Sequence, residues 1–281
     1  MNAKNYGRLA VVLATAGAIG AMGLPLADAA PAVQPHYAYG ALVDHSAKSF
    51  SAQGVRELST AAAPASVDLS PYAASPGNQG QVGSCVAWAI DYSAYSILMK
   101  EQGITGAPMA PMYTYAQIAR GNDQGSYPKD HFKILTSQGL DTRADYWQGD
   151  YDYTTQPTSA QRTNAAHWKL SGYTSLNTGS ALKAGVQDSL AKGLPVVITI
   201  PVYGSFEKIS RSAAQAYTYY PSSGEQLLGY HEITIIAYND KGVRIQNSWG
   251  TSWGDGGFIN VPWRFVTGQV QEAEAVGKLV K

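Results

Sequence analysis

Asn78-Gln79-Gly80-Gln81-Val82-Gly83-Ser84-Cys85-Val86-Ala87-Trp88 carries the only cysteine of the chain and places it where a helix begins. Apolar residues recur from there to Leu98 at the spacing of one helical face, which predicts a helix over residues 84–102 that stops before Gly103. The first turn of a helix carries a partial positive charge and free N–H groups, and both stabilise a thiolate. The position of Cys85 alone therefore favours a reactive thiol.

The composition is that of a globular chain without a strong charge of either sign. Of the 281 residues, 45% are hydrophobic, only 14% are charged, and 20 basic residues balance 20 acidic ones. These values exclude a disordered chain and a coiled coil, and they leave no basic surface for nucleic acid. A single cysteine excludes an internal disulfide and a cysteine-rich metal site. We also expect no metal and no cofactor.

The first 29 residues have the layout of a secretory signal peptide. Lys4 and Arg8 give a positive start, residues 9–26 form an apolar run, and Ala27-Asp28-Ala29 is a small-x-small cleavage pattern. The alternative is a membrane anchor, but several glycines and Pro25 interrupt a run that is near the lower limit for spanning. We expect the peptide to be removed, with no stable membrane span afterwards, and the protein to be periplasmic or extracellular.

The pattern of the chain changes from helices to strands along its length. Residues 30–66, rich in Ala, Ser and Pro, are expected to form a short leader or propeptide-like segment rather than a domain. Beyond the cysteine helix, helices are predicted over residues 112–119, 130–138 and 180–192, and a long polar loop over 141–163. Strands are predicted over residues 194–203, 231–238, 243–246 and 257–261. Helices first and strands afterwards indicate an α+β protein with two lobes.

Two later segments carry the groups that a cysteine nucleophile needs. Gly229-Tyr230-His231-Glu232-Ile233-Thr234 places a histidine at the start of a strand, and Gln246-Asn247-Ser248-Trp249-Gly250-Thr251-Ser252-Trp253-Gly254 follows it. A nucleophilic thiolate requires an imidazole partner and a third group that orients the imidazole. Cys85, His231 and Asn247 could supply this set. The remaining histidines, which are expected to be structural or exposed, are His36, His45, His131 and His167.

These three segments together resemble the papain family of cysteine proteases. The resemblance implies that Cys85 is the nucleophile, that His231 is its general acid and base, and that Asn247 orients the imidazole. It also implies that Gln79 supplies the side-chain donor of the oxyanion hole, with the backbone N–H of Cys85 as the second donor. Trp249 matches the indole that shields the His–Asn hydrogen bond from water.

The resemblance extends from about Val67 to Phe265 and implies a papain-like two-lobed fold. A helical lobe over about 84–165 would carry the cysteine helix, and a β-barrel-like lobe over about 166–270 would carry His231 and Asn247. The active-site cleft would lie between the lobes, within a peptidase domain over residues 67–281. One departure is that Val82 stands where many members have a second cysteine, so this lobe must be stabilised by packing alone.

The substrate-binding wall of the family is matched less closely. Its Gly-Gly-Tyr-Pro stretch corresponds to Gly125-Ser126-Tyr127-Pro128, where Ser126 makes a close backbone approach doubtful. The resemblance places Thr199 and Glu232 at the same pocket, which receives the second residue before the scissile bond. A carboxylate there would attract Arg or Lys. The alternative is that Glu232 pairs with Lys129 or a backbone donor and never contacts the substrate.

Three functions are compatible with this sequence. The favoured one is an exported endopeptidase that hydrolyses peptide or protein substrates through a thioester on Cys85. The alternatives are another acyl transfer by the same triad, of the amidase or transglutaminase type, and a catalytically silent binding protein that retains the fold. The leader over residues 30–66 is expected to lie along or near the cleft and to restrain activity until it is cut, although a flexible spacer would have the same composition.

Overall fold

The computed structural model describes residues 37–44, 63–146 and 148–280, and these belong to one compact unit, Pro35–Lys281. The predicted signal peptide and residues 30–36 and 45–62 of the predicted leader, with His36 and His45 among them, lie outside the described residues. Among the residues that are described, none of the helices has the length and the apolar character needed to cross a lipid bilayer.

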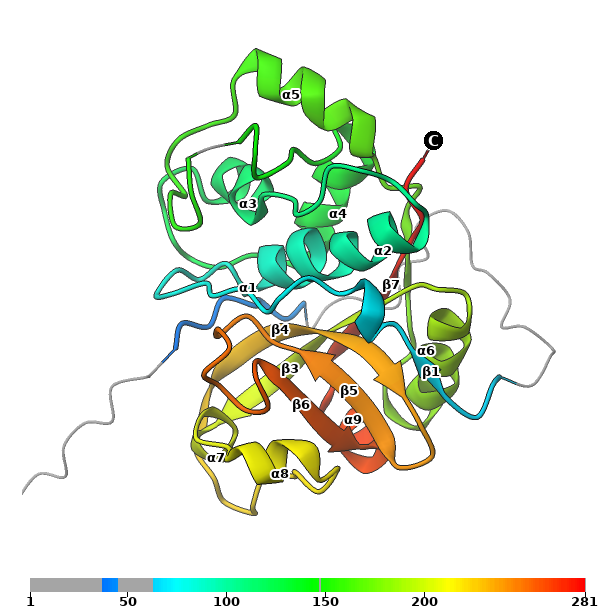
Figure 1. The fold of residues 1–281 in the computed structure, drawn as a ribbon. Coiled ribbons are helices and arrows are strands. Elements are labelled where there is room, and N and C mark those ends of the chain that lie inside the picture. Colours follow the sequence, from blue (N-terminus) through cyan, green and yellow to red (C-terminus); the bar gives the residue numbers. More distant parts are fainter. Residues whose placement is uncertain (1–36, 45–62, 147, 281) are drawn as a thin grey trace, which may run out of the picture. The chain divides into compact units, whose positions relative to one another are not determined.

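The helical lobe is built on one long buried helix that begins at the cysteine. It consists of α1 (Cys85–Ala87), a π-helical stretch (Trp88–Ala94) and α2 (Tyr95–Glu101), and Gly103 follows it with a positive φ of 66°. This confirms the predicted helix and its glycine stop. α3 (Pro111–Ala119) and α4 (Pro128–Ser137) pack against each other beside it (Figure 1).

One element of this lobe corrects the sequence prediction. Residues 141–163 are not wholly loop, because α5 (Ser159–Ala165) begins within them. Its N-terminus is a capping box: the Thr158 hydroxyl accepts from the backbone N–H of Gln161, and the Gln161 side chain accepts from the backbone N–H of Thr158. A Thr-x-x-Gln pattern predicts such a helix start, but the polar residues around it favoured the interpretation as a loop.

The second lobe is an antiparallel sheet. The strand order is β2-β7-β3-β4-β5-β6, and β1 (Val67–Asp68) pairs with the far end of β4. β4 begins earlier than predicted, because the pairing with β3 already starts at Leu227. The strands are β2 (Tyr173–Ser175), β3 (Val196–Tyr203), β4 (Leu227–Tyr238), β5 (Gly242–Gln246), β6 (Phe258–Pro262) and β7 (Glu272–Val276).

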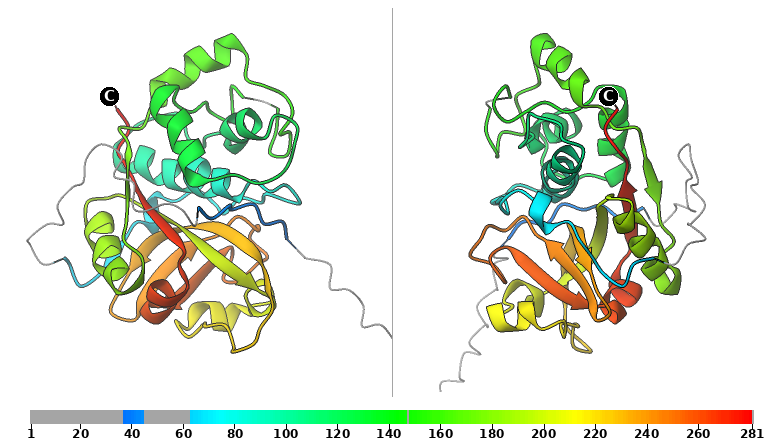
Figure 2. Two further views of the ribbon diagram at one scale, coloured as in Figure 1. Left: turned by 180° about the vertical axis from the view of Figure 1, so that it is seen from behind. Right: turned by 45° about the vertical axis from the view of Figure 1, so that its right-hand side comes forward.

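Short helices cover this sheet, and beyond β7 the chain continues up beside the helical lobe, where Val280 donates to the Lys169 carbonyl (Figures 1 and 2). α6 was predicted from the sequence, whereas α7, α8, α9 and the strands β2 and β7 were not. β7 reads Glu-Ala-Glu-Ala-Val, in which small alanines alternate with charges, so it lacks the β-branched pattern that marks the other strands. The helices are α6 (Leu182–Ala191), α7 (Gly204–Glu207), α8 (Arg211–Gln215) and α9 (Trp263–Gln269).

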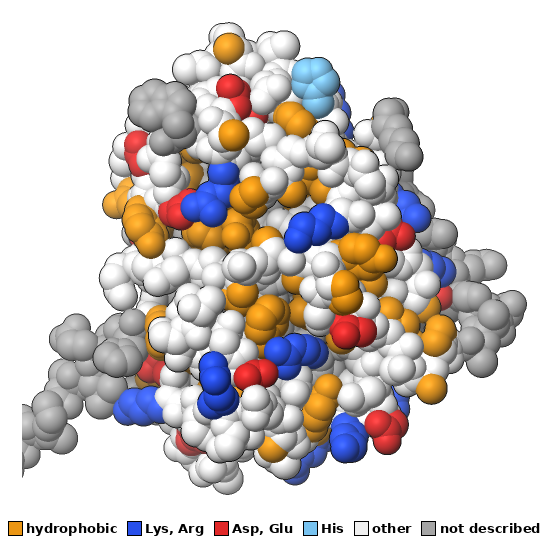
Figure 3. All heavy atoms as spheres, in the orientation of Figure 1, with side chains coloured by type: hydrophobic (Ala, Val, Ile, Leu, Met, Phe, Trp, Pro, Cys, Tyr) orange, Lys and Arg blue, Asp and Glu red, His pale blue; other side chains and the backbone are white. Residues whose placement is uncertain are grey.

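Two hydrophobic cores meet across the sheet. One fills the β lobe around Trp249, and the other fills the helical lobe around the cysteine helix. The helical-lobe core also includes Val197 of β3, so one face of the sheet packs directly on the cysteine helix. The Thr234 hydroxyl donates to the Ala89 carbonyl at 2.9 Å in this contact. The exposed face in Figure 3 intersperses basic and acidic side chains, in keeping with a net charge of zero.

Candidate active site

Cys85 lies at the first turn of its helix and is completely buried. The loop before it turns at Gly80, which has a φ of 59° that favours glycine. Burial raises the pKa of the Cys85 thiol to about 12, although backbone hydrogen bonds from Glu232, Gly40 and Val86 act in the opposite direction. The thiol is therefore protonated in this structure, and the helix N-terminus alone does not make it a thiolate.

His231 is held from two sides in the β lobe. Its Nε2 lies 2.7 Å from Oδ1 of Asn247, and its ring stacks on Trp249 with centroids 4.5 Å apart. Its Nδ1 is buried and has no hydrogen-bond partner among the described residues. Burial lowers the pKa of His231 to about 4, so the imidazole is neutral here. One ring nitrogen is thus engaged by Asn247 and the other is free to exchange a proton.

The environment of Cys85 and His231 in this structure favours the neutral form of both groups. Both Cys85 and His231 are fully buried, and a low-dielectric environment disfavours the charged form of each. The backbone of Glu232, the residue after His231, still reaches the Cys85 sulfur. The cysteine helix and the histidine strand therefore meet at the expected place, with both groups neutral.

Gln79 joins the cysteine loop to the asparagine segment. Its Oε1 accepts from the Ser248 hydroxyl at 2.7 Å, and its backbone N–H donates to the Ser248 carbonyl at 2.9 Å. Its Nε2 donates to the carbonyls of Val82 at 3.0 Å and Ala38 at 3.2 Å. The side-chain donor that the resemblance assigns to the oxyanion hole is thus bonded to the carbonyl of Ala38, which lies in the predicted leader.

The chain at residues 37–44 runs between the two lobes, where the blue segment lies in Figures 1 and 2. It forms a parallel bridge with the predicted substrate wall: the Ser126 N–H donates to the Gly40 carbonyl at 2.8 Å, and the Leu42 N–H donates to the Ser126 carbonyl at 3.0 Å. The Ala41 N–H donates to the Tyr230 carbonyl at 3.3 Å. A Cβ on Gly40 would lie 1.8 Å from the Gly83 carbonyl oxygen, so only glycine fits there.

Ser126 does not prevent close backbone approach, which corrects the doubt raised by the sequence. Its hydroxyl points away from the bound segment and lies 2.9 Å from Nε2 of His131. The other ring nitrogen of His131 lies 2.8 Å from the Thr114 hydroxyl, which in turn donates to Asp91. His131 is thus a buried structural histidine, and its hydrogen-bond chain holds the serine side chain inside the helical lobe.

Glu232 and Thr199 are brought together, but not at an exposed rim. The two are cross-strand neighbours on β4 and β3, both are fully buried, and the Thr199 hydroxyl donates to the Glu232 carboxylate. Burial raises the pKa of Glu232 well above its usual range, and its Oε1 has no partner among the described residues. Lys129 pairs instead with Asp44 at 2.6 Å. In this structure Glu232 is therefore buried rather than exposed at a rim, and its carboxyl is bonded by Thr199 rather than by Lys129.

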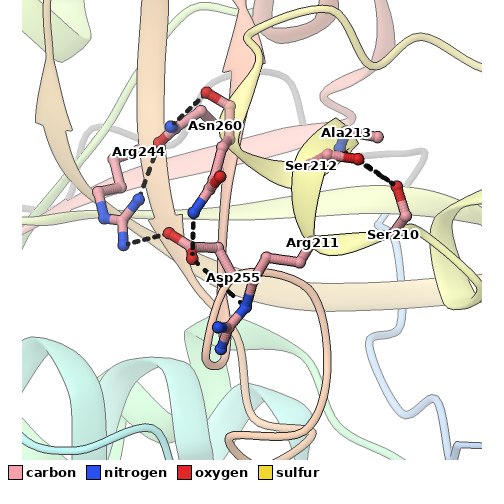
Figure 4. A network of polar contacts seen from close by, with 8 residues as sticks. Ser210, Arg211, Ser212, Ala213, Arg244, Asp255 and Asn260 are labelled. Atoms are coloured by element: carbon pink, nitrogen blue, oxygen red, sulfur yellow. Dashed lines mark hydrogen bonds and ion pairs between the residues drawn. The ribbon is translucent and has the colours of Figure 1, made fainter.

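A polar network anchors the loop that carries the tryptophans (Figure 4). Asp255 lies at its centre and accepts from Arg244 of β5 at 3.1 Å and from Gln215 of α8 at 2.8 Å. Arg244 also donates to Asn260 of β6 at 3.2 Å. The loop is therefore tied to two strands and a helix, which keeps Trp249 in place against His231.

Three residues that make contacts at the cleft were not predicted from the sequence: Tyr37, Tyr39 and Glu207. Tyr37 stacks on Trp249 with centroids 4.3 Å apart and an interplanar angle of 6°, and the Tyr39 hydroxyl donates to Glu207 of α7. None of them belongs to a motif, and the contacts join segments far apart in sequence. In the part of the chain that is described, no group of three His, Cys, Asp or Glu side chains is arranged to hold a metal ion.

Comparison with known proteins agrees with this geometry. Residues 63–273 match the sequence profile described as papain family cysteine protease. The chain is 25% identical over 209 residues to an uncharacterized peptidase C1-like protein of Acanthamoeba polyphaga mimivirus, covering 70% of this chain and 67% of that protein. It is 28% identical over 193 residues to digestive cysteine proteinase 2 of Homarus americanus, covering 66% and 56%.

The fold is shared with solved structures at low sequence identity. Xylellain, a cysteine protease from Xylella fastidiosa, matches with a TM-score of 0.74 at 21% identity, covering 88% of this chain and 97% of that one. Digestive procathepsin L 3 of Tenebrio molitor matches with a TM-score of 0.61 at 20% identity, covering 79% and 72%. The two-lobed α+β fold expected from the sequence is confirmed.

Proposed function

The chain belongs to the papain family of cysteine proteases and is a cysteine-type peptidase, and from this premise we propose that it is an exported endopeptidase using Cys85, His231 and Asn247. The observation that carries the triad is the hydrogen bond of 2.7 Å between Nε2 of His231 and Asn247, which leaves Nδ1 without a partner. The proposal of export rests on the signal-like residues 1–29 alone.

In the proposed mechanism the cysteine proton moves to Nδ1 of His231. The thiolate attacks the carbonyl carbon of the scissile bond, and the oxyanion accepts hydrogen bonds from Nε2 of Gln79 and the backbone N–H of Cys85. The imidazolium then protonates the leaving amine, which departs and leaves a thioester. His231 next takes a proton from water, the hydroxide attacks the thioester, and the thiol is restored. Asn247 holds the imidazole in one orientation throughout.

The leader is proposed to keep the enzyme latent. Residues 37–44 use the hydrogen-bonding groups of Ser126, Tyr230 and Gln79 that a substrate backbone would need. Gly40 of this segment contacts the Cys85 sulfur, Tyr37 stacks on the Trp249 ring that covers His231, and both Cys85 and His231 are buried and neutral. Removing this segment would rehydrate the pair, lower the pKa of the thiol and raise that of the imidazole. A segment that served only as a spacer would not be expected to form these hydrogen bonds.

The acyl-side pocket is proposed to comprise Gly125-Ser126-Tyr127-Pro128, with Thr199 and Glu232 behind it. Tyr127 and Pro128 begin α4, so a helix fixes the wall. Oε1 of Glu232 has no partner among the described residues, and an arginine or lysine side chain that entered the pocket would favour the ionised form of this carboxyl and donate to it. This supports a preference for a basic residue at the second position before the scissile bond.

The proposal is tested by labelling and cleavage on a chain that folds with its leader. A recognition sequence for a site-specific protease is inserted after Gln53, outside the described residues, and the folded protein is cut and dialysed. We expect an epoxide thiol inhibitor to label Cys85 after the cut but not before it, and the cut protein to hydrolyse mixed peptides. If Cys85 is labelled but no peptide is hydrolysed, another acyl transfer is favoured. If neither labelling nor hydrolysis occurs, a silent binding protein is favoured. Equal activity before and after the cut would leave the leader as a spacer.

A further inference from the structure

Tyr39 occupies a defined site in the cleft. Its hydroxyl donates to the Glu207 carboxylate, and its ring lies against Gly229, where a Cβ would be only 2.8 Å from the ring atom Cδ2. The ring of Trp249 is tilted against it at 55°, with centroids 6.2 Å apart. Glu207 accepts the hydrogen bond of the phenol, Gly229 leaves room for the ring because it has no side chain, and Trp249 supplies an aromatic wall.

Glu207 is the residue whose placement demands an explanation. It is only 4% exposed, and within the described ranges it forms no ion pair with a lysine, arginine or histidine. A carboxylate removed from water is costly unless a donor replaces the lost hydration. The Tyr39 hydroxyl is that donor in this structure, and when residues 37–44 leave, the acceptor remains at the cleft without it.

The site lies on one particular side of the cysteine. The backbone of Gly40 contacts the Cys85 sulfur, residues 41 and 42 continue along Ser126, and residues 37–39 continue towards Trp249 and Glu207. A peptide that binds across Cys85 therefore passes Glu207 on the side away from Ser126.

We propose that Glu207, Gly229 and Trp249 form a tyrosine site, which selects substrates carrying a tyrosine side chain on the side of the scissile bond away from Ser126. The inference rests on the proposed function, because it assigns a substrate class to the same cleft. Tyr39 is the internal occupant that shows the fit. The site distinguishes tyrosine from phenylalanine through the phenol, since a phenylalanine would bury the carboxylate without a donor.

The first test measures binding without catalysis. The Cys85→Ala variant is cut after Gln53 and dialysed, and a fluorescent peptide spanning residues 37–44 is titrated against it by anisotropy. Replacing Tyr39 by phenylalanine in the peptide should raise Kd roughly ten- to hundredfold, the range of a hydrogen bond to a charged acceptor. Glu207→Leu should raise Kd for the tyrosine peptide and abolish the difference. Equal Kd values for the two peptides would overturn the tyrosine site.

The second test measures substrate choice. Peptides that place tyrosine or phenylalanine in turn at each position around one scissile bond are given to the cut enzyme. We expect kcat/KM to favour tyrosine about tenfold or more at one position on the leaving-group side only. Glu207→Leu should remove this preference, Glu207→Gln should retain part of it through its amide oxygen, and Asp240→Asn, at an exposed turn, should leave it unchanged.

The two tests separate the site from the function on which it rests. An enzyme that cleaves peptides with the same kcat/KM for tyrosine and phenylalanine at every position would refute the tyrosine site and leave the peptidase intact. A protein that cleaves no peptide would refute the endopeptidase proposal, and the binding measurement would still decide whether Glu207 recognises the phenol.

Discussion

Nε2 of His231 lies 2.7 Å from Oδ1 of Asn247, and the same amide oxygen accepts from the Ser248 backbone N–H at 2.7 Å. An amide oxygen that is fixed by its own backbone cannot rotate away from the imidazole without losing both hydrogen bonds. The ring of Trp249 covers this pair from one side. The orientation of His231 is thus determined by residues 247–249, a segment without a group that reacts.

Asn247→Ala should slow the enzyme without abolishing it. The imidazole loses its orienting hydrogen bond, which is worth about 1.5–3 kcal/mol when the ring is charged, so kcat/KM should fall roughly ten- to hundredfold. Peptide hydrolysis by the cut protein measures this. Asn177→Ala, at an exposed position, is the matched control and should have no effect. Complete loss of labelling by the thiol inhibitor would show that Asn247 does more than orient the ring.

The reactivity of Cys85 should depend on the leader. In the intact chain the pKa of the thiol is raised to about 12 and that of His231 is lowered to about 4, so at pH 7 both groups are neutral. Alkylation of the uncut chain at pH 7 should be at least about a hundredfold slower than that of a free cysteine. After the cut, the rate should rise at low pH and activity should follow a bell-shaped pH profile. A rate that is unchanged by the cut would contradict this.

Gln79→Ala should reduce turnover and also loosen the loop before the cysteine. One oxyanion donor contributes roughly 2–4 kcal/mol of transition-state stabilisation, so kcat should fall by about two to three orders of magnitude. The Ser248 hydroxyl also loses its acceptor, which lowers the free energy of unfolding by about 1 kcal/mol. Ser248→Ala separates the two effects, because it should lower stability while kcat changes little.

The sequence predicted those parts of the fold that local pattern determines. The helix that begins at Cys85 and the strand that carries His231 follow from apolar spacing and β-branched runs, and the resemblance placed Gln79 and Asn247 beside them. α5 was missed although Thr158 and Gln161 form its capping box. The pattern of a polar helix is weak when only two of its residues are buried.

The parts that could not be predicted depend on contacts between distant segments. Glu207 meets Tyr39 across 168 positions, and neither residue lies in a motif. Ser126 was expected to hinder backbone approach because its partner, His131, cannot be identified from spacing alone. The neutral states of Cys85 and His231 follow from their burial among segments distant in sequence, residues 37–44 included, and no sequence pattern indicates this burial.

The free energy of unfolding of the intact chain should fall as pH rises through the neutral range. Burial, followed by the nearby Glu272 charge, raises the pKa of Glu274 to about 8, whereas an unfolded glutamate titrates near 4.3. Between these values the folded state holds the proton that the unfolded state has lost, so stability decreases with pH. The loss between pH 7 and pH 8, where His231 is neutral in both the folded and the unfolded state and does not oppose it, should be about 1 kcal/mol and should shrink in Glu274→Gln. Denaturant unfolding of the Cys85→Ala chain at both pH values measures it.

Glu232→Gln tests how the acyl-side pocket reads its substrate. Glu232 is buried beside Thr199 on the sheet face opposite to His231, so the substitution leaves the hydrogen bond to Asn247 in place. If the unpartnered oxygen of Glu232 binds a basic side chain, the substitution should cost about 1–2 kcal/mol of transition-state stabilisation. The value of kcat/KM should then fall for peptides with arginine at the second position before the scissile bond. Peptides with leucine there should be cleaved as before. Glu274→Gln is the control, since it removes the charge that repels the Glu232 carboxylate but leaves the Glu232 acceptor in place. An equal change for arginine and leucine peptides would make Glu232 a structural carboxyl held by Thr199.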